Sequence, residues 1–344
     1  MFVYRNFSLR NLLKFTGPHI LGISLWVVLV TYTYSAANLQ WLTIPWLPLS
    51  LIGTAVAFYV GFKNNSAYDR MWEARKIWGA MVNSSRSWGS AVRAYVADQF
   101  RKESITKEEL HSIHRHLLHR HIGWLYVLRS QLLKPTTWEH VSQKGSVGRK
   151  ANALQKKYGG IARGEVNLES LQEYLTETDS RKVLSARNAA TQIIDLQAQS
   201  LAALRRDDLL DDFRHMELQK ILNSFYEHQG KAERIKKFPL PRQYANTSLL
   251  FIYIFIFLLP LGMASEFMKM GEWALWLSVP FTILVCWVYI MMELVGDYTE
   301  NPFQGMGNDI PMLSLCRTIE IDLKEMLGEE NIPDPIQEKE GVLM

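Results

Sequence analysis

A run of histidines is the most conspicuous chemical feature of this 344-residue chain. The run, HSIHRHLLHRH, carries His111, His114, His116, His119 and His121. Pairs three residues apart can share one face of a helix, and neutral imidazole is a common metal ligand. Arg115 and Arg120 are interleaved with the histidines and would repel a metal cation. We therefore predict a solvated or inter-subunit helix, in which pH sensing is favoured over metal binding.

Two carboxylates lie close together near the end of an apolar run. Glu293 and Asp297 are one helical turn apart, where they could attract cations or hold a proton. The alternative is structural, with both residues packed against Arg70 or Arg75 of a neighbouring helix. We favour this structural role.

The remaining chemistry-bearing residues do not support catalysis. The sequence contains no nucleophile beside a base, no phosphate-binding glycine loop and no Cys/His zinc spacing. Cys286 and Cys316 are expected to be small buried apolar residues. The formal net charge is +4, and no stretch combines basic density with an aromatic platform for nucleic acid. We predict no enzyme, no cofactor, no metal site and no nucleic-acid partner.

Runs without charged residues predict four membrane-spanning helices. No Asp, Glu, Lys or Arg occurs between Lys14 and Lys63. This stretch is too long for one span and suits two, joined by a bend near 41–48, where Trp41 would lie at the lipid–water boundary. Two further runs, 243–264 and 273–292, each have the length of roughly 20 residues that one span requires.

Lysine and arginine residues predict the orientation of these spans. They precede the first span, follow the second and precede the third: Arg5, Arg10, Lys14, Lys63, Arg70, Arg75, Lys76, Arg234, Lys236, Lys237 and Arg242. By the positive-inside rule, both termini and the long middle segment are cytoplasmic. The expected organisation is transmembrane helices 1 and 2 in 1–62, a cytoplasmic helical domain in 63–242, transmembrane helices 3 and 4 in 243–292, and a cytoplasmic C-terminal segment in 293–344. The second span is expected to continue into the cytoplasm as one long helix, and 134–180 is expected to be a loop-rich excursion.

The second span carries a stripe that could line a pore. Thr54, Phe58 and Phe62 are four residues apart, which places them on one helix face. Beside them lies a row of small residues, Gly53, Ala57 and Gly61, which would let neighbouring helices approach closely. Around an oligomer axis, such stripes would form rings, and hydrophobic constrictions can gate ions by dewetting. Spacing alone leaves open that the phenylalanines pack into lipid or against another helix.

Three segments of the chain resemble the bestrophin family, specifically its bacterial branch. They are IGTAVAFYVGFKNNSAYDRMWEARKIWG at 52–79, KAERIKKFPLPRQYA at 231–245 and NPFQGMGNDIPMLSLCRTIEIDL at 301–323. The resemblance covers most of the chain outside 134–180. It implies an all-α membrane protein with four transmembrane helices per subunit, a homopentamer around one central ion path in the bacterial inner membrane. The implied partners are other copies of the chain, the lipid bilayer and small permeant ions.

The resemblance also implies two narrow parts of the ion path. The three neck positions in the membrane fall on Thr54, Phe58 and Phe62. At Thr54 the family more often has an apolar Ile, so a hydroxyl here is expected to wet the outer end of the neck. The second narrowing, the cytoplasmic aperture, falls on Leu222, with Ile221 as the alternative.

The segment after Asn-Pro-Phe departs from the pattern of the animal members, which hold calcium there in an acidic run. In this chain the run is QGMGND, with Asp309 as its only carboxylate. Calcium requires six to eight oxygen ligands, several of them anionic. We therefore predict no calcium site, and expect that Asn308 or Asp309 begins the C-terminal helix as its N-cap.

The predicted function is passive conduction of small monovalent ions through a central pore, with anions such as chloride first. A monovalent-cation channel of the same fold is the alternative, because aromatic rings can present edges to anions or faces to cations. A membrane-anchored sensor or scaffold without conduction is the alternative of another class.

Overall fold

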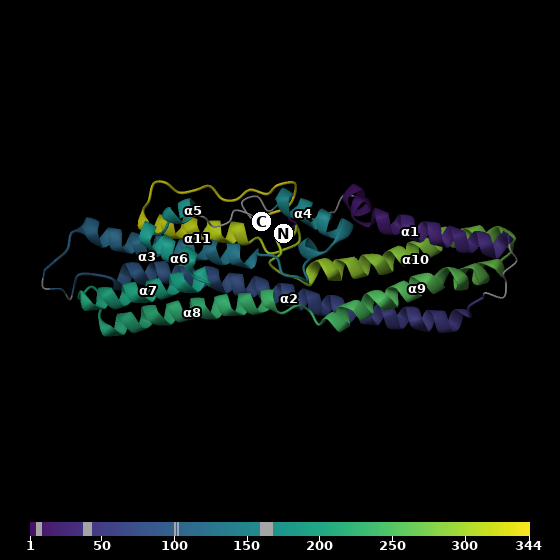
Figure 1. The fold of residues 1–344 in the computed structure, drawn as a ribbon, viewed down its shortest axis with the longest axis horizontal. Coiled ribbons are helices and arrows are strands. Elements are labelled where there is room, and N and C mark those ends of the chain that lie inside the picture. The colour runs from purple at the N-terminus through teal and green to yellow at the C-terminus, as the bar shows by residue number, and fades with distance from the viewer. Residues whose placement is uncertain (5–8, 37–42, 100, 102, 159–167) are drawn as a thin grey trace. The chain divides into compact units, whose positions relative to one another are not determined.

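The computed structural model describes residues 1–4, 9–36, 43–99, 101, 103–158 and 168–344. Helices connected by turns and short loops make up this part of the chain, and no strand occurs in it, only isolated bridges such as Phe2 with Val342. The described chain divides into two compact units, whose elements are labelled in Figure 1. Arg5 and Trp41, which entered the predictions of orientation and bend, lie outside the described residues.

The first unit comprises Tyr4–Arg70 and Pro239–Asn301, and we call it the apolar unit. It contains α1 (Leu9–Ala36), the beginning of α2 (Trp46–Tyr95), α9 (Arg242–Met268) and α10 (Glu272–Thr299). Among the described residues, these are the four helices long and apolar enough to cross a membrane. Their apolar parts coincide with the three charge-free runs of the sequence, the first of which holds two spans. Val27, Val60, Ile252 and Cys286 belong to the core that the four helices share.

Helix α2 is a single helix of 50 residues, as the sequence predicted. Pro48 lies in its first turn, where the missing N–H has no helical partner to lose. No proline interrupts the helix after that point. At 1.5 Å per residue the helix is about 75 Å long. Its residues up to Arg70 belong to the apolar unit and the rest to the second unit.

The second unit comprises Met1–Val3, Met71–Phe238 and Pro302–Met344. Its helices besides α2 are α3 (Lys107–Leu132), α4 (Gly145–Tyr158), α5 (Leu168–Gln172), α6 (Glu177–Ser185), α7 (Ala189–Arg206), α8 (Asp212–Lys237) and α11 (Met312–Leu327). Helix α3 packs against α7, α8 and α11. Trp78, Trp88, Trp124 and Phe225 are fully buried in this core.

Side-chain caps define where α3 and α8 of the second unit begin. Thr106 and Glu109 form a capping box at the start of α3, in which each side chain binds the other residue's backbone N–H. Asp211 accepts hydrogen bonds from the first N–H groups of α8. Both caps stabilise long helices whose apolar faces build the core.

The segment 134–180 contains more helix than the sequence indicated. It includes the 3₁₀ turn η2 (His140–Ser142), α4, α5 and the beginning of α6. Gly145 starts α4 with a φ of 80°, and Gly148 lies inside that helix. Residues 159–167 lie outside the described residues, and the loop-rich excursion as a whole stays a prediction.

Along the chain, the boundaries between the two compact units lie near 70, 238 and 301. The predicted domain boundaries at 62, 242 and 292 refer to a membrane rather than to compactness. They stay a prediction.

Candidate functional site

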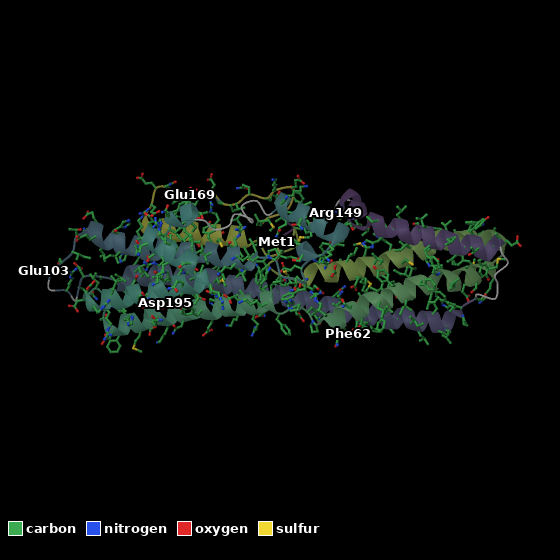
Figure 2. The ribbon with its side chains drawn as sticks, in the orientation of Figure 1. Met1, Phe62, Glu103, Arg149, Glu169 and Asp195 are labelled. Atoms are coloured by element: carbon green, nitrogen blue, oxygen red, sulfur yellow. The ribbon has the colours of Figure 1, made fainter. Side chains whose placement is uncertain are left out.

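The predicted pore stripe lies on an exposed face of α2. Phe58 and Phe62 are each 65% exposed, and Thr54 is exposed as well. Figure 2 labels Phe62 at the edge of the helices. Two of the flanking residues, Val56 and Val60, point the other way and are buried in the core of the apolar unit. The aromatic side chains are therefore available for water, lipid or another subunit.

The row of small residues runs from a position packed inside the chain to one that is open. Gly53 packs inside the chain, because a Cβ added there would lie 2.8 Å from a ring carbon of Phe255. The Tyr289 hydroxyl also donates a hydrogen bond to the Gly53 carbonyl at 2.9 Å. Ala57 is half-buried. A Cβ at Gly61 would meet no described atom within 4 Å, which leaves this position open to a neighbouring chain.

The Thr54 hydroxyl is committed to its own helix. It donates a hydrogen bond to the Ser50 carbonyl at 2.9 Å. Because a hydroxyl has one proton and two lone pairs, only acceptor capacity remains for anything facing Thr54.

A buried ion pair lies directly behind the stripe. Lys63, one residue after Phe62, is 1% exposed and contacts Glu293 of α10. The other carboxylate oxygen of Glu293 accepts a hydrogen bond from Ser248 of α9 at 2.7 Å. Glu293 thus has the structural role that the sequence favoured, but its partner is Lys63 rather than Arg70 or Arg75. The pair links α2, α9 and α10 at the level of Phe62.

Comparisons with known proteins assign the chain to a family. The family model described as bacterial/fungal bestrophin protein matches residues 12–325. The chain belongs to the bestrophin family.

Two curated relatives of this bestrophin are named voltage-dependent anion channel-forming proteins. YneE of Escherichia coli strain K12 is 27% identical, over 84% of this chain and 79% of its own length. The protein mll4386 of Mesorhizobium japonicum is also 27% identical, over 82% of this chain and 75% of its own. A crystal structure of a bacterial bestrophin homolog from Klebsiella pneumoniae shares the fold, with a TM-score of 0.71 and 20% identity over 90% of this chain and 98% of that one.

The structure of this bestrophin places the aperture residue expected from the sequence inside a core. Leu222 is 1% exposed and lies in the core of the second unit. A side chain this deeply buried in the single chain is poorly placed to line a path between subunits. Ile221 is half-buried and packs against the same core.

The beginning of α8 carries apolar side chains that the sequence reasoning missed. Phe213 is 83% exposed, more than any other large hydrophobic side chain in the described part, and Met216 is also exposed. Both lie within the first turns after the Asp211 cap. The available signal was two large apolar residues, three apart, in the otherwise polar stretch DDFRHME.

The histidines of α3 point in different directions and bind different partners. His114 contacts the Val96 carbonyl at 2.9 Å, His119 contacts Glu329 at 2.7 Å and His121 contacts the Ser85 hydroxyl at 2.8 Å. His116 contacts Arg120. The expectation of a solvated helix is wrong for the second half of α3, which is buried. Burial lowers the pKa of His121 to about 3, so this ring is neutral in the folded chain.

Asp309 organises the segment after Asn-Pro-Phe. Its carboxylate accepts hydrogen bonds from the backbone N–H groups of Phe303, Gly305 and Ile310, at 3.0, 2.8 and 2.7 Å. Burial raises its pKa, and these three amides and nearby Lys236 oppose that shift. The N-cap prediction is wrong, because α11 begins after Pro311 without a side-chain cap. No group of three or more potential metal ligands occurs among the described residues.

Proposed function

We propose that this bestrophin chain is the subunit of a homopentameric membrane channel that conducts small monovalent ions passively, anions such as chloride first. The observation that carries the proposal is the exposure of Phe58 and Phe62, one turn apart on the face that also holds Thr54. Two observations support the choice of anions: the chain belongs to the bestrophin family, and its relatives are named anion channel-forming proteins.

The neck of the proposed pore is made by five copies of the stripe. In a cyclic homo-oligomer, equivalent residues of all subunits lie at one level around the axis. The two phenylalanine levels then form hydrophobic rings that gate by dewetting. The Thr54 level is wetter. It presents hydroxyl oxygens as acceptors, because each hydroxyl proton is hydrogen-bonded to the Ser50 carbonyl.

The cytoplasmic aperture of the proposed channel is formed by Phe213 instead of Leu222. A pore-lining side chain must be exposed in the isolated subunit, and Phe213 meets this condition at 83% whereas Leu222 does not. Its position beside the capped start of α8 fixes the backbone that carries it.

The proposed location is the bacterial inner membrane, with four spans and both termini in the cytoplasm. The spans are the four apolar helices of the apolar unit. Residues 63–242 and 293–344 form the cytoplasmic part. Lysines and arginines on either side of the predicted spans support this orientation.

Recordings from planar bilayers test the proposal. Purified protein under an asymmetric NaCl gradient should give single-channel currents, and a reversal potential near that of chloride would support anion conduction. A reversal potential near that of sodium would assign the cation alternative. Absence of current from correctly assembled protein would refute the channel and favour a sensor or scaffold.

The double variant F58A/F62A tests the stripe itself. Widening and wetting the neck should raise the conductance or the open probability. Leu25→Ala is the matched control, because Leu25 is an equally exposed apolar residue on α1, away from the stripe. Unchanged currents in F58A/F62A would mean that the phenylalanines face lipid.

A further inference from the structure

The exposed face of α2 continues beyond the phenylalanines with polar residues. Asn65 and Asp69 follow Phe62 and are both exposed. At 3.6 residues per turn, Asp69 lies within about 20° of the direction of Phe62, and Asn65 within about 60°. The side chains of Thr54, Phe58, Phe62, Asn65 and Asp69 therefore occupy one face of a single helix.

The Asp69 carboxylate has no cationic partner among the described ion pairs of the apolar unit. Within the described part of the chain, it accepts a hydrogen bond from the Asn65 amide at 3.4 Å, a neutral donor on the same face. The nearest lysine in the sequence, Lys63, points away from this face by about 120° relative to Asp69 and is buried with Glu293. Arg70 is half-buried and interacts electrostatically with Glu300. The negative charge of Asp69 is thus left on the face that carries the neck.

The next cation along this face is already neutralised. Lys76, about two turns further along α2, forms an ion pair with Glu73 at 2.7 Å. It therefore contributes little net charge to offset Asp69.

We propose that Asp69 is a selectivity-determining residue, which forms a ring of carboxylates at the inner mouth of the neck. This proposal rests on the proposed channel function and names a residue that shifts the ion preference of the channel toward cations. Seven residues at 1.5 Å place Asp69 about 10 Å inward of Phe62, which is about one Debye length at 0.1 M salt. A ring of like charges at this distance concentrates cations and depletes anions at the entrance of the neck.

The size of the effect follows from Coulomb's law. The ring carries five unit charges, and each acts on an ion through water over about 10 Å. Salt screening over one Debye length weakens each interaction energy. Together the five charges change the local concentration of a monovalent ion roughly fourfold. Cations rise and anions fall by this factor. Asp69 therefore changes the ratio of sodium to chloride permeability on the order of tenfold.

Asp69→Asn tests the proposal in planar bilayers under an asymmetric NaCl gradient. The ratio of sodium to chloride permeability should fall roughly tenfold from its wild-type value, and the reversal potential should move toward that of chloride. The difference should shrink at 1 M salt, where the Debye length is only about 3 Å. Asp69→Glu should retain the wild-type ratio. Glu103→Gln, which removes an exposed carboxylate outside α2, should also leave the ratio unchanged.

The outcomes separate this inference from the proposed function. Currents in D69N with an unchanged reversal potential would overturn the carboxylate ring and leave the channel intact. Absence of current in the wild type would overturn the channel instead.

Thiol labelling provides a second measurement if D69N assembles poorly. In Asp69→Cys, an anionic and a cationic methanethiosulfonate reagent should shift the reversal potential in opposite directions. The native cysteines Cys286 and Cys316 are both buried, so the new thiol is the reactive one. Shifts in the same direction, or none, would overturn the proposal.

Discussion

The ion pair between Lys63 and Glu293 should be far more sensitive to loss of one partner than to loss of both. Both side chains are almost completely buried, and the two oxygens of Glu293 are bound by Lys63 and by Ser248. Lys63→Met would leave a buried carboxylate with the Ser248 hydroxyl as its one remaining donor among the described residues. Breaking a buried pair in this way costs about 3–5 kcal/mol, because the remaining charge has neither water nor a counter-ion.

The double variant K63M/E293M should recover most of this loss. Replacing a whole buried ion pair by apolar side chains of similar volume is often neutral or stabilising by about 1–4 kcal/mol. Ser248→Ala should have an intermediate effect of about 1.5–3 kcal/mol, since it removes one hydrogen bond to a charged group. The order of stability is therefore wild type and double variant, then S248A, then K63M.

Thermal and denaturant unfolding in detergent, followed by tryptophan fluorescence, measures this order. Protein and detergent concentrations must be equal for all variants, because oligomerisation shifts apparent stability by mass action. Lys269→Met is the matched control, since Lys269 forms an exposed pair with Glu266 at 2.7 Å and should contribute at most about 1 kcal/mol. A double variant as unstable as K63M would refute the reasoning that an unpaired charge causes the loss.

Three further predictions follow from packing and burial. Gly53→Ala should destabilise the chain by about 1–3 kcal/mol in thermal unfolding, because the added Cβ would meet the Phe255 ring. Gly61→Ala should change subunit stability by less than about 1 kcal/mol, because its Cβ would meet no described atom within 4 Å. Leu222→Ala should cost about 2–5 kcal/mol in the same assay, and Phe213→Ala should instead alter single-channel conductance with little loss of stability. Between pH 6.5 and about 3, the free energy of unfolding should fall as the pH falls, because His121 is protonated in the unfolded state and not in the folded state. At pH 5 the loss is about 2 kcal/mol. His121→Phe should remove this part of the pH dependence.

Features that depend on a continuous stretch of sequence were predictable. The four apolar helices follow from runs without charges, and the length of α2 follows from a helical pattern that no proline interrupts. The shared direction of Phe58 and Phe62 follows from spacing within one helix. Each of these properties depends on neighbours in the chain, so tertiary packing did not change it.

Features that depend on distant contacts were not predictable. Lys63 and Glu293 are 230 positions apart, and nothing local in the sequence identifies one as the partner of the other. Which face of α8 is buried depends on α3 and α7 packing against it, so counting along the chain placed the aperture on Leu222, a core residue. The histidines of α3 likewise acquired their partners from distant parts of the chain, since His121 contacts Ser85 of α2 and His119 contacts Glu329 after α11.

In the proposed channel, the stripe on α2 assigns gating and charge selection to different residues. The rings of Phe58 and Phe62 carry no charge, so they impede hydrated cations and anions through the same dewetting barrier. Asp69 acts through its electrostatic field, which salt screens and which has opposite signs for the two kinds of ion. Raising the ionic strength should therefore weaken the selectivity that Asp69 contributes while leaving the hydrophobic gate unchanged. A pore whose open probability and ion preference both changed together with salt would have its gate and its filter in the same place, contrary to the separation along α2.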